Sequence, residues 1–265
     1  MKKIIFISMV IMISVSFAKA QDRIFTYTYQ SNVLAPGEKE IEVWNTFGTG
    51  RQDFYRGYEN KIEFETGIAK NLQTAFYFKV NSSSGYNMSN DSALSSSTSI
   101  AFSNEWKYKL SDPVANAIGS ALYTELELSQ NGVETENKII LDKKMGRNTF
   151  ALNLVGTYEV VKTTEGKLLK NEKEFRAEFD FGYAYYLGKG FNFGLEAQSL
   201  SKHEYGEWKY SALYAGPVLS YSRDKFWINL TVMPQITAFR GATYKNLVLD
   251  DQQKLNTRLA FSFAL

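Results

Sequence analysis

The feature that most constrains this chain is the alternation in Glu174–Tyr185, EFRAEFDFGYAY. Every second residue from Phe175 onward is aromatic or apolar, whereas the positions between carry Glu, Arg, Asp or a small residue. Successive side chains of a β-strand point to opposite faces, so the segment predicts a strand with one aromatic and one charged face. Weaker copies run from near residue 38 to residue 265, which is typical of a closed barrel with an apolar outer surface.

The N-terminus predicts export. Lys2 and Lys3 precede an apolar run that reaches Ala18, and a small-x-small site follows at residues 18–20. This is the order of a cleaved secretory signal peptide. We therefore assign residues 1–20 to a signal peptide, 21–37 to an N-terminal periplasmic segment and 38–265 to the barrel. Whether residues 21–37 hang in the periplasm or plug the barrel stays open at this stage.

Composition excludes several classes of site. The chain has no cysteine, so disulfides, thiolate metal sites, cysteine nucleophiles and an N-terminal lipidated cysteine are excluded. Cleavage removes three lysines and no acid, which lowers the formal net charge from +2 by three, to −1. No basic tract or basic-aromatic patch is present, so we expect no nucleic-acid partner.

Period-two alternation predicts an all-β chain with twelve strands and no helix. The sixth predicted strand alternates poorly, and Pro217 and Pro234 fall inside predicted strands. Because proline lacks the N–H of a ladder bond, we expect a bulge or a strand end at each proline. The predicted strands span residues 38–47, 60–69, 72–82, 99–110, 117–129, 136–145, 149–160, 174–186, 191–200, 210–221, 226–237 and 254–265.

The predicted connections alternate between long and short, except for the short segment Gln130–Thr135. Tight turns on one rim and long loops on the other are typical of an up-and-down outer-membrane barrel with both chain ends on the turn side. The serine-rich segment 82–98 is interpreted as a flexible surface loop. Aromatic residues near the turns predict an interfacial girdle, although β-propensity alone would also favour them. The girdle candidates are Trp106, Tyr108, Tyr183, Tyr185, Phe191, Phe193, Tyr221, Phe226 and Trp227.

Barrel size decides which face points inward. Twelve strands around an apolar interior would enclose a void too wide to pack, whereas a polar interior holds water and ion pairs. The charged faces are therefore predicted to line the lumen, either as a network that braces the wall or as a narrow, ion-discriminating pore. The predicted lumen-lining residues are Glu63, Glu65, Lys79, Glu105, Lys107, Glu125, Arg176, Glu178, Asp180, Glu196 and Arg258, joined by Glu40, Glu42 and Glu127 and by the uncharged Tyr214, Asn229 and Thr231.

No residue pattern favours catalysis. The single histidine, His203, falls in a predicted loop at 201–209, and no Gly-x-Ser-x-Gly motif is present. No His, Asp or Glu set has the linear spacing of a metal site. We expect neither an enzyme nor a cofactor. A membrane-embedded lipid hydrolase is kept as a minor alternative that would use His203.

The C-terminal strand carries the most specific resemblance. LNTRLAFSFAL, with Leu259, Phe261, Phe263 and Leu265 alternating to the terminus, resembles the insertion signal of bacterial outer-membrane β-barrels. The whole chain is similar in style to uncharacterised barrels of Bacteroidota-type bacteria and, more loosely, to the phenol-degradation outer-membrane transporter family. Leu265 departs from the signal's usual aromatic end.

This resemblance implies an outer-membrane location, contact with outer-membrane lipid and recognition by the barrel-assembly machinery through the C-terminal strand. The leading hypothesis is a narrow channel or uptake protein for a small-molecule solute. The alternative is a non-conducting structural or surface-recognition barrel that acts through its loops, such as Gly48–Glu59 and Ala238–Gln253.

Overall fold

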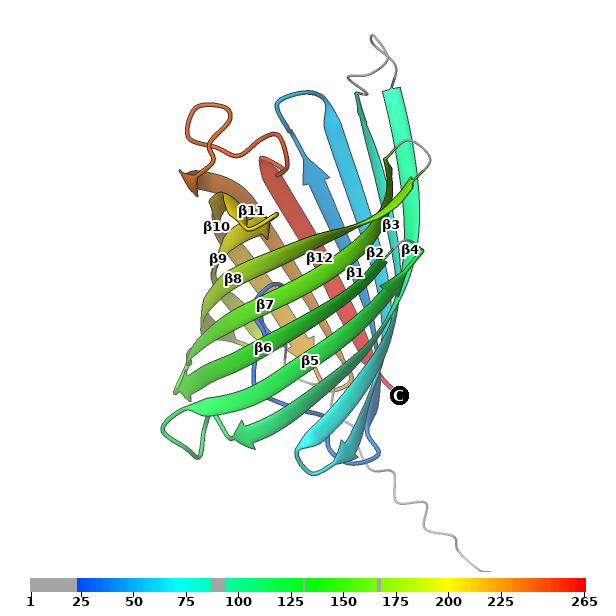
Figure 1. The fold of residues 1–265 in the computed structure, drawn as a ribbon. Helices are drawn as coiled ribbons and strands as arrows, with labels where there is room; N and C mark the ends of the chain where they lie inside the picture. Colours follow the sequence, from blue (N-terminus) through cyan, green and yellow to red (C-terminus); the bar gives the residue numbers. More distant parts are fainter. Residues whose placement is uncertain (1–22, 87–93, 131, 166–167) are drawn as a thin grey trace, which may run out of the picture.

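The computed structural model shows one closed barrel of twelve antiparallel strands, each paired with its neighbours in the chain and β1 paired with β12 (Figure 1). It describes residues 23–86, 94–130, 132–165 and 168–265. These parts of the chain contain no helix long and apolar enough to cross a membrane. The strands are β1 (Lys39–Thr49), β2 (Tyr55–Ala69), β3 (Leu72–Tyr86), β4 (Leu94–Ser111), β5 (Gly119–Ser129), β6 (Gly132–Met145), β7 (Asn148–Glu165), β8 (Leu168–Gly188), β9 (Phe191–Glu204), β10 (Glu207–Arg223), β11 (Phe226–Arg240) and β12 (Leu255–Ala264).

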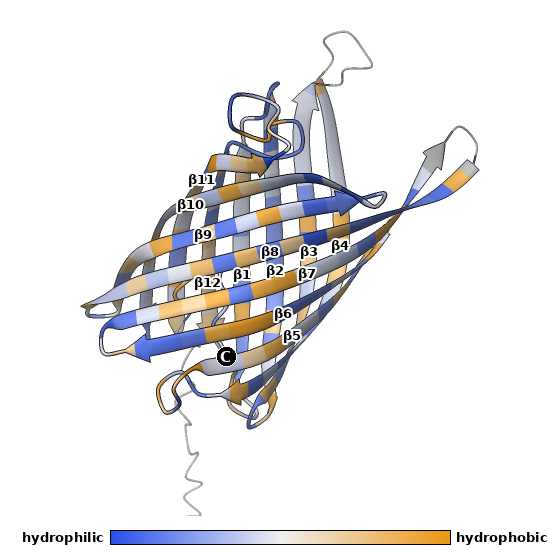
Figure 2. Cartoon of the chain, turned by 60° about the vertical axis from the view of Figure 1, so that its left-hand side comes forward, coloured by the Kyte–Doolittle hydropathy of each residue, from blue (hydrophilic) through white to orange (hydrophobic). Residues whose placement is uncertain are grey.

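The alternation in the sequence becomes the two faces of the wall (Figure 2). In β8, Phe179 is 45% exposed on the outside, whereas the next residue, Asp180, is 2% exposed on the inside. Phe76, Phe102 and Leu230 repeat the outward exposure on other strands. Large apolar side chains exposed all round a wall would favour aggregation in water, so this surface is built for lipid.

All twelve predicted strands are confirmed, but many run further than predicted at the rim that carries the predicted long loops, here called the loop rim. The segment 82–98 was predicted to be a flexible loop. Its described ends instead pair as strands, with hydroxyl contacts of 2.9 Å between Ser83 and Ser97 and between Ser84 and Ser96. Small polar side chains satisfy one another across the ladder, so backbone pairing continues beyond the apolar belt.

The opposite rim, here called the turn rim, carries the predicted tight turns and the C-terminus (Figure 1). In the turn after β4, the Asp112 carboxylate accepts hydrogen bonds from Lys109 Nζ at 2.7 Å and from the N–H groups of Val114 and Ala115 at 2.9 and 3.0 Å. These contacts, that of Lys109 foremost, hold the pKa of Asp112 below its usual range. The Asp-Pro turn is thereby fixed as an Asx-type turn.

The two strand prolines interrupt one seam of the wall. Between β10 and β11 the paired residues stop at Tyr214 with Gln235 and resume at Val218 with Thr231. Pro217 and Pro234 both lie in the gap, where neither can donate a ladder bond. Register shifts occur in β10 just before the gap, on either side of Ala212 and Leu213. The expected bulge or strand end does not fall at either proline: both strands continue through it, the pairing between β10 and β11 is interrupted there, and the register shifts lie a few residues earlier in β10.

One girdle assignment is wrong. Trp227 lies near a turn in the sequence, but its ring is fully buried inside the barrel, donates to Glu40 Oε1 at 2.7 Å and packs against Trp44 with ring centroids 6.0 Å apart. Its neighbours Phe226 and Ile228 point outward, so parity along β11 places Trp227 inward. Proximity to the rim misled the prediction because a girdle also requires the outward face.

The N-terminal residues 23–34 lie inside the lumen rather than beneath it, and we call them the plug. Phe25, Thr26 and Thr28 are fully buried. The plug joins β1 through residues 35–38, where Gly37 N donates to Gly67 O at 2.9 Å. Of the two placements left open for residues 21–37, the structure shows the lumen for residues 23–34, because the polar interior offers partners to an extended backbone. The predicted signal peptide lies outside the described residues.

The connection between β11 and β12 lies at the loop rim (Figure 1), and part of it is bonded to the inner wall. Val248 and Leu249 are 2% and 4% exposed, and Val248 N donates to Gln235 Oε1 at 2.6 Å. The carbonyl of Gln253 accepts a hydrogen bond from Tyr214 Oη at 2.8 Å. Val248, Leu249 and Gln253 therefore anchor the predicted recognition loop to the interior wall, whereas residues 241–246 are exposed.

Candidate functional site

A single carboxylate holds the middle of the plug. Glu196, on β9, accepts the backbone N–H groups of Thr26, Tyr27 and Thr28 at 3.1, 2.8 and 2.8 Å. The hydroxyl of Thr231 donates to the same carboxylate at 2.6 Å. Hydrogen bonds to an ionised acceptor are roughly twice as strong as neutral ones. Three converging amides therefore make Glu196 the main polar clamp on the plug.

Amide side chains of the wall hold the plug on either side of this clamp. Asn153 accepts from Tyr29 N at 2.6 Å and donates to Tyr29 O at 3.0 Å, which mimics a strand pair. Asn229 donates to Arg23 O at 3.0 Å, and Gln73 accepts from Leu34 N at 3.0 Å. The plug backbone is thus satisfied by side chains instead of by strand pairing, so it can leave without breaking the ladder.

Small residues on the inner face of the wall form the seat of the plug. Phe25 packs with Ile24, Ala151, Ala184 and Val218 in one buried cluster. A Cβ atom at Gly182 would lie 2.9 Å from ring carbons of Phe25. Glycine at position 182 is therefore what admits the ring.

Two plug tyrosines face cations of the wall and of the plug itself. The guanidinium of Arg258 lies 4.0 Å from the ring centre of Tyr27, and Lys138 Nζ lies 4.1 Å from that of Tyr29. Arg23 stacks on the other side, 4.0 Å from the ring centre of Tyr29 and 4.4 Å from that of Trp44. Cation–π contacts in a desolvated setting contribute on the order of 2 kcal/mol each.

The plug separates two cavities. The cavity toward the loop rim has a volume of about 600 Å³, and Tyr27 and Tyr29 form part of its lining. The cavity toward the turn rim has a volume of about 1060 Å³ and contacts Ile24 and Leu34 of the plug. Residues of the plug therefore line both cavities.

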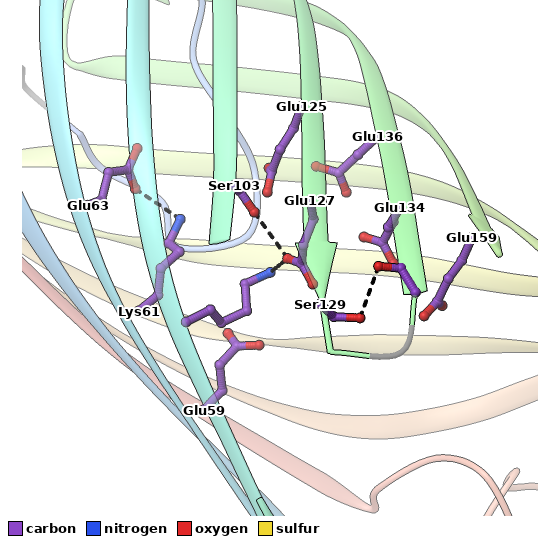
Figure 3. Close-up of polar contacts among 12 residues, drawn as sticks. Glu59, Lys61, Glu63, Ser103, Glu125, Glu127, Ser129, Glu134, Glu136 and Glu159 are labelled. Carbon is purple, nitrogen blue, oxygen red and sulfur yellow. Dashed lines mark hydrogen bonds and ion pairs between the residues drawn. The ribbon is translucent and has the colours of Figure 1, made fainter. Parts of the chain in front are cut away.

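Strand register assembles a row of glutamates along the inner wall (Figure 3). Cross-strand pairs join consecutive members directly, except that Tyr77 and Ser103 lie between the second and the third. The row climbs from the turn-rim half of β1 to the loop-rim end of β9 because the strands are tilted. We call it the glutamate row: Glu42, Glu63, Glu127, Glu134, Glu159, Glu174 and Glu204.

Few cations serve the upper part of the row, which runs from Glu127 to Glu204. Arg176 alone contacts three of its carboxylates, Glu134, Glu159 and Glu174, with the last two pairs at 3.0 Å. Lys79 pairs with Glu127, and Lys202 with Glu174 at 2.8 Å. Directly opposed like charges on neighbouring strands destabilise a sheet, so Arg176 stabilises this wall.

The lower part of the row belongs to a denser cluster. Oxygen atoms of Glu42, Glu63 and Glu65 all lie within 4.8 Å of one another. Glu105 lies in the same row as Glu65, with only Ala75 between them. All four glutamates are 0–1% exposed. We call this set, Glu42, Glu63, Glu65 and Glu105, the acidic pocket.

The structure places all eleven predicted lumen residues on the inner face. Glu63, Glu65, Glu105, Lys107, Asp180 and Glu196 are buried there. Lys79, Glu125, Glu178, Asp180 and Arg258 line the loop-rim cavity. Arg176 forms the ion pairs of the upper row. Glu196 and Arg258 are brought together on the plug, where both bind Thr26. Arg176 is remote from this contact, near the loop rim.

His203 lies on β9, not in a loop as predicted. Its ring stacks on Trp208, with centroids 5.3 Å apart, and lies near Phe175 on the outer face.

The plug residues were not predicted as site residues. In the sequence, Gly182 and Ala184 could have indicated the plug, because two small residues on a charged inner face leave room for another part of the chain.

Sequence comparison assigns the chain over almost its whole length. Residues 17–265 match the family of unknown function DUF6662. The chain belongs to this family. No curated protein matches it.

Solved structures share the barrel at low identity. The COG4313 outer membrane channel from Pseudomonas putida has a TM-score of 0.64 and 10% identity, over 91% of this chain and 100% of that one. The translocator domain of the autotransporter NalP from Neisseria meningitidis has a TM-score of 0.57 and 10% identity, over 88% and 90%. The NanC porin has a TM-score of 0.53 and 13% identity, over 85% and 100%. These likenesses show the fold.

Proposed function

We propose that this protein is an outer-membrane channel for small cationic solutes and that the plug controls its conductance. The observation that carries the proposal is the pair of cavities separated by a segment that the wall holds through side chains. Breaking the hydrogen bonds of Glu196 and of the neighbouring amide side chains frees the plug while all twelve strands stay paired. The channel-type proteins among the structural neighbours support the same reading.

The preference for cations follows from the inner charges. The upper row presents five carboxylates to the lumen, and the cations paired with them are Lys79, Arg176 and Lys202. A lumen with excess negative charge raises the local concentration of cations and repels anions. Tyrosine and serine side chains in the loop-rim cavity add hydrogen-bonding groups and flat faces suited to a small polar solute.

Planar-bilayer recording of the folded mature chain tests the channel. Deletion of residues 23–34 should produce steady conductance with K⁺ favoured over Cl⁻, whereas the intact chain should conduct rarely. Glu196→Gln should give an intermediate result. Hydrogen bonds to a charged group contribute about 1.5–3 kcal/mol, so weakening the clamp raises the displaced fraction roughly tenfold or more.

Glu178→Gln is the matched control, because this inward carboxylate accepts from Gln198 Nε2 at 2.9 Å and forms no hydrogen bond or ion pair with the described plug residues. Its conductance should equal that of the intact chain. If the deletion variant does not conduct although its heat-modifiable gel mobility shows a folded barrel, the proposed channel function is excluded.

A non-conducting recognition barrel is the second candidate, because the plug and the residues around Val248 fill much of the interior. Under this reading, deletion within residues 241–247 abolishes surface binding and leaves permeability unchanged. We also propose an outer-membrane location after signal-peptide cleavage and delivery by the barrel-assembly machinery through β12. Similarity to Bacteroidota-type barrels and to phenol-degradation transporters stays a hypothesis. So does the lipid hydrolase, which an unchanged activity in His203→Ala would remove.

A further inference from the structure

We propose that the acidic pocket binds one Ca²⁺ ion. Glu42, Glu63 and Glu65 already bring oxygen atoms within 4.8 Å of one another. Oxygens bound to one Ca²⁺ at about 2.3–2.6 Å lie at most about 5 Å apart, so these atoms are close enough to share that ion. Mg²⁺ gives up its water ligands reluctantly and is usually held by only one or two carboxylates, so a buried pocket of four carboxylates suits Ca²⁺ better. The site and its test are independent of whether the barrel conducts.

Unpartnered oxygens point to a ligand rather than to internal pairing. Among the described residues, Glu42 Oε1, Glu65 Oε2 and both carboxylate oxygens of Glu105 accept no hydrogen bond. Each of these residues is 0–1% exposed. A buried carboxylate oxygen without a partner loses its hydration at considerable cost, and a cation offsets that cost.

The local charge balance also favours a bound cation. Glu63 Oε2 pairs with Lys61 at 2.9 Å, and no other ion pair within 4.0 Å reaches the pocket among the described residues. The four buried carboxylates of the pocket outnumber the buried cations on β2, β4 and the plug. The carboxylates are Glu42, Glu63, Glu65 and Glu105, and the cations are Arg23, Lys61 and Lys107.

Register explains how the chain builds this pocket. Glu42 and Glu63 are direct partners on β1 and β2, and Glu65 follows Glu63 on the same face. Ala75 leaves room for Glu65 and Glu105 to approach from either side. Trp44 donates to Glu42 Oε2 at 2.9 Å, which orients that carboxylate. Trp44 and Lys61 also line the loop-rim cavity, which provides a route for the ion.

Calorimetric titration of CaCl₂ into the metal-stripped, folded mature protein tests the site. We expect one Ca²⁺ per chain and at least a tenfold loss of affinity in Glu65→Gln and in Glu105→Gln. Both substitutions keep side-chain shape, and the oxygens concerned have no other partner to lose. The matched control is Glu159→Gln/Glu174→Gln, which removes two carboxylates from the upper row and should leave Ca²⁺ affinity unchanged.

Thermal unfolding provides a second readout. Ca²⁺ should raise the unfolding temperature of the intact chain and of the control but not that of Glu65→Gln/Glu105→Gln. Without Ca²⁺, the pocket variants should be more stable than the intact chain, because they relieve repulsion. Absence of Ca²⁺ binding to the intact chain would overturn the proposal. It would mean that protons, rather than a metal ion, neutralise the carboxylates of the pocket. Loss of binding in the control alone would overturn it as well.

Discussion

The upper glutamate row and the acidic pocket both bring carboxylates of like charge close together, but they differ in what offsets the repulsion. In the upper row, Glu134, Glu159 and Glu174 remain 19–27% exposed at their side chains, and Arg176 bridges all three. In the pocket, Glu65 and Glu105 are at most 1% exposed and have no such bridge. Partial hydration screens the repulsion between like charges, so one arginine is enough to stabilise these three carboxylates of the upper row. Burial removes that screening, so the pocket needs an ion of higher charge.

The largest predicted effect comes from removing the arginine that bridges the upper row. Arg176→Leu leaves three neighbouring carboxylates without their shared cation and should lower the free energy of unfolding by about 3 kcal/mol, near the value for a broken buried pair. Urea unfolding in detergent measures the loss. Arg223→Leu is the control, because its pair with Asp224 is more than 70% exposed and should contribute little. Equal losses in both variants would contradict the bridging role.

The second prediction concerns the plug, which lies between the loop-rim and turn-rim cavities. Gly182→Ala places a methyl group 2.9 Å from the ring of Phe25 and should displace the plug, since overpacking costs about 1–3 kcal/mol. Conductance should rise while gel mobility still reports a folded barrel. At Gly156, on the outer face, the corresponding contact with Phe175 is an ordinary 3.6 Å. Gly156→Ala should therefore conduct like the intact chain. A rise of conductance in both variants would mean that the plug does not control conductance.

The third prediction uses salt to separate the regions. Raising KCl from about 0.1 M to about 1 M shortens the Debye length from about 10 to about 3 Å. Cation selectivity of the plug-deleted channel, measured as a reversal potential, should fall strongly because the upper row is hydrated. Ca²⁺ affinity of the buried pocket should fall much less. Selectivity that is unaffected by salt would place the selective charges out of contact with water.

The smallest effect is expected from a single member of the upper row. Glu159→Gln removes one of three partners of Arg176 and should change the free energy of unfolding by only about 0.5 kcal/mol. The double-mutant cycle with Arg176→Leu measures their coupling. A coupling above about 2 kcal/mol would mean that Arg176 serves mainly Glu159 rather than all three.

The sequence predicts the wall well because lipid and lumen impose a strict period of two. Glu178 and Arg258 could be placed inward from parity alone. Strand ends were harder, since the ladder extends past the apolar belt where Ser83 and Ser97 pair. Trp227 lies close to a turn but on the inward parity of β11, and parity decides which face its ring takes.

The glutamate row and the acidic pocket could not be predicted, because both depend on register. Glu63 and Glu65 are visible in the sequence, but their meeting with Glu42 follows from the geometry between strands. The plug was also beyond period-two reasoning, since its backbone is held by Glu196 and Asn153 instead of by a neighbouring strand.

The gap in the ladder between β10 and β11 makes the plug a structural part of the wall. Tyr27 packs with Tyr214 and Met233, which flank or lie within that gap, in one buried cluster. Side-chain packing there replaces backbone bonds that Pro217 and Pro234 cannot form. If the plug is displaced, as the proposed channel requires, this seam loses that packing while the strand pairs on either side of the gap remain. We therefore expect opening of the lumen to be accompanied by faster amide hydrogen exchange along β10 and β11.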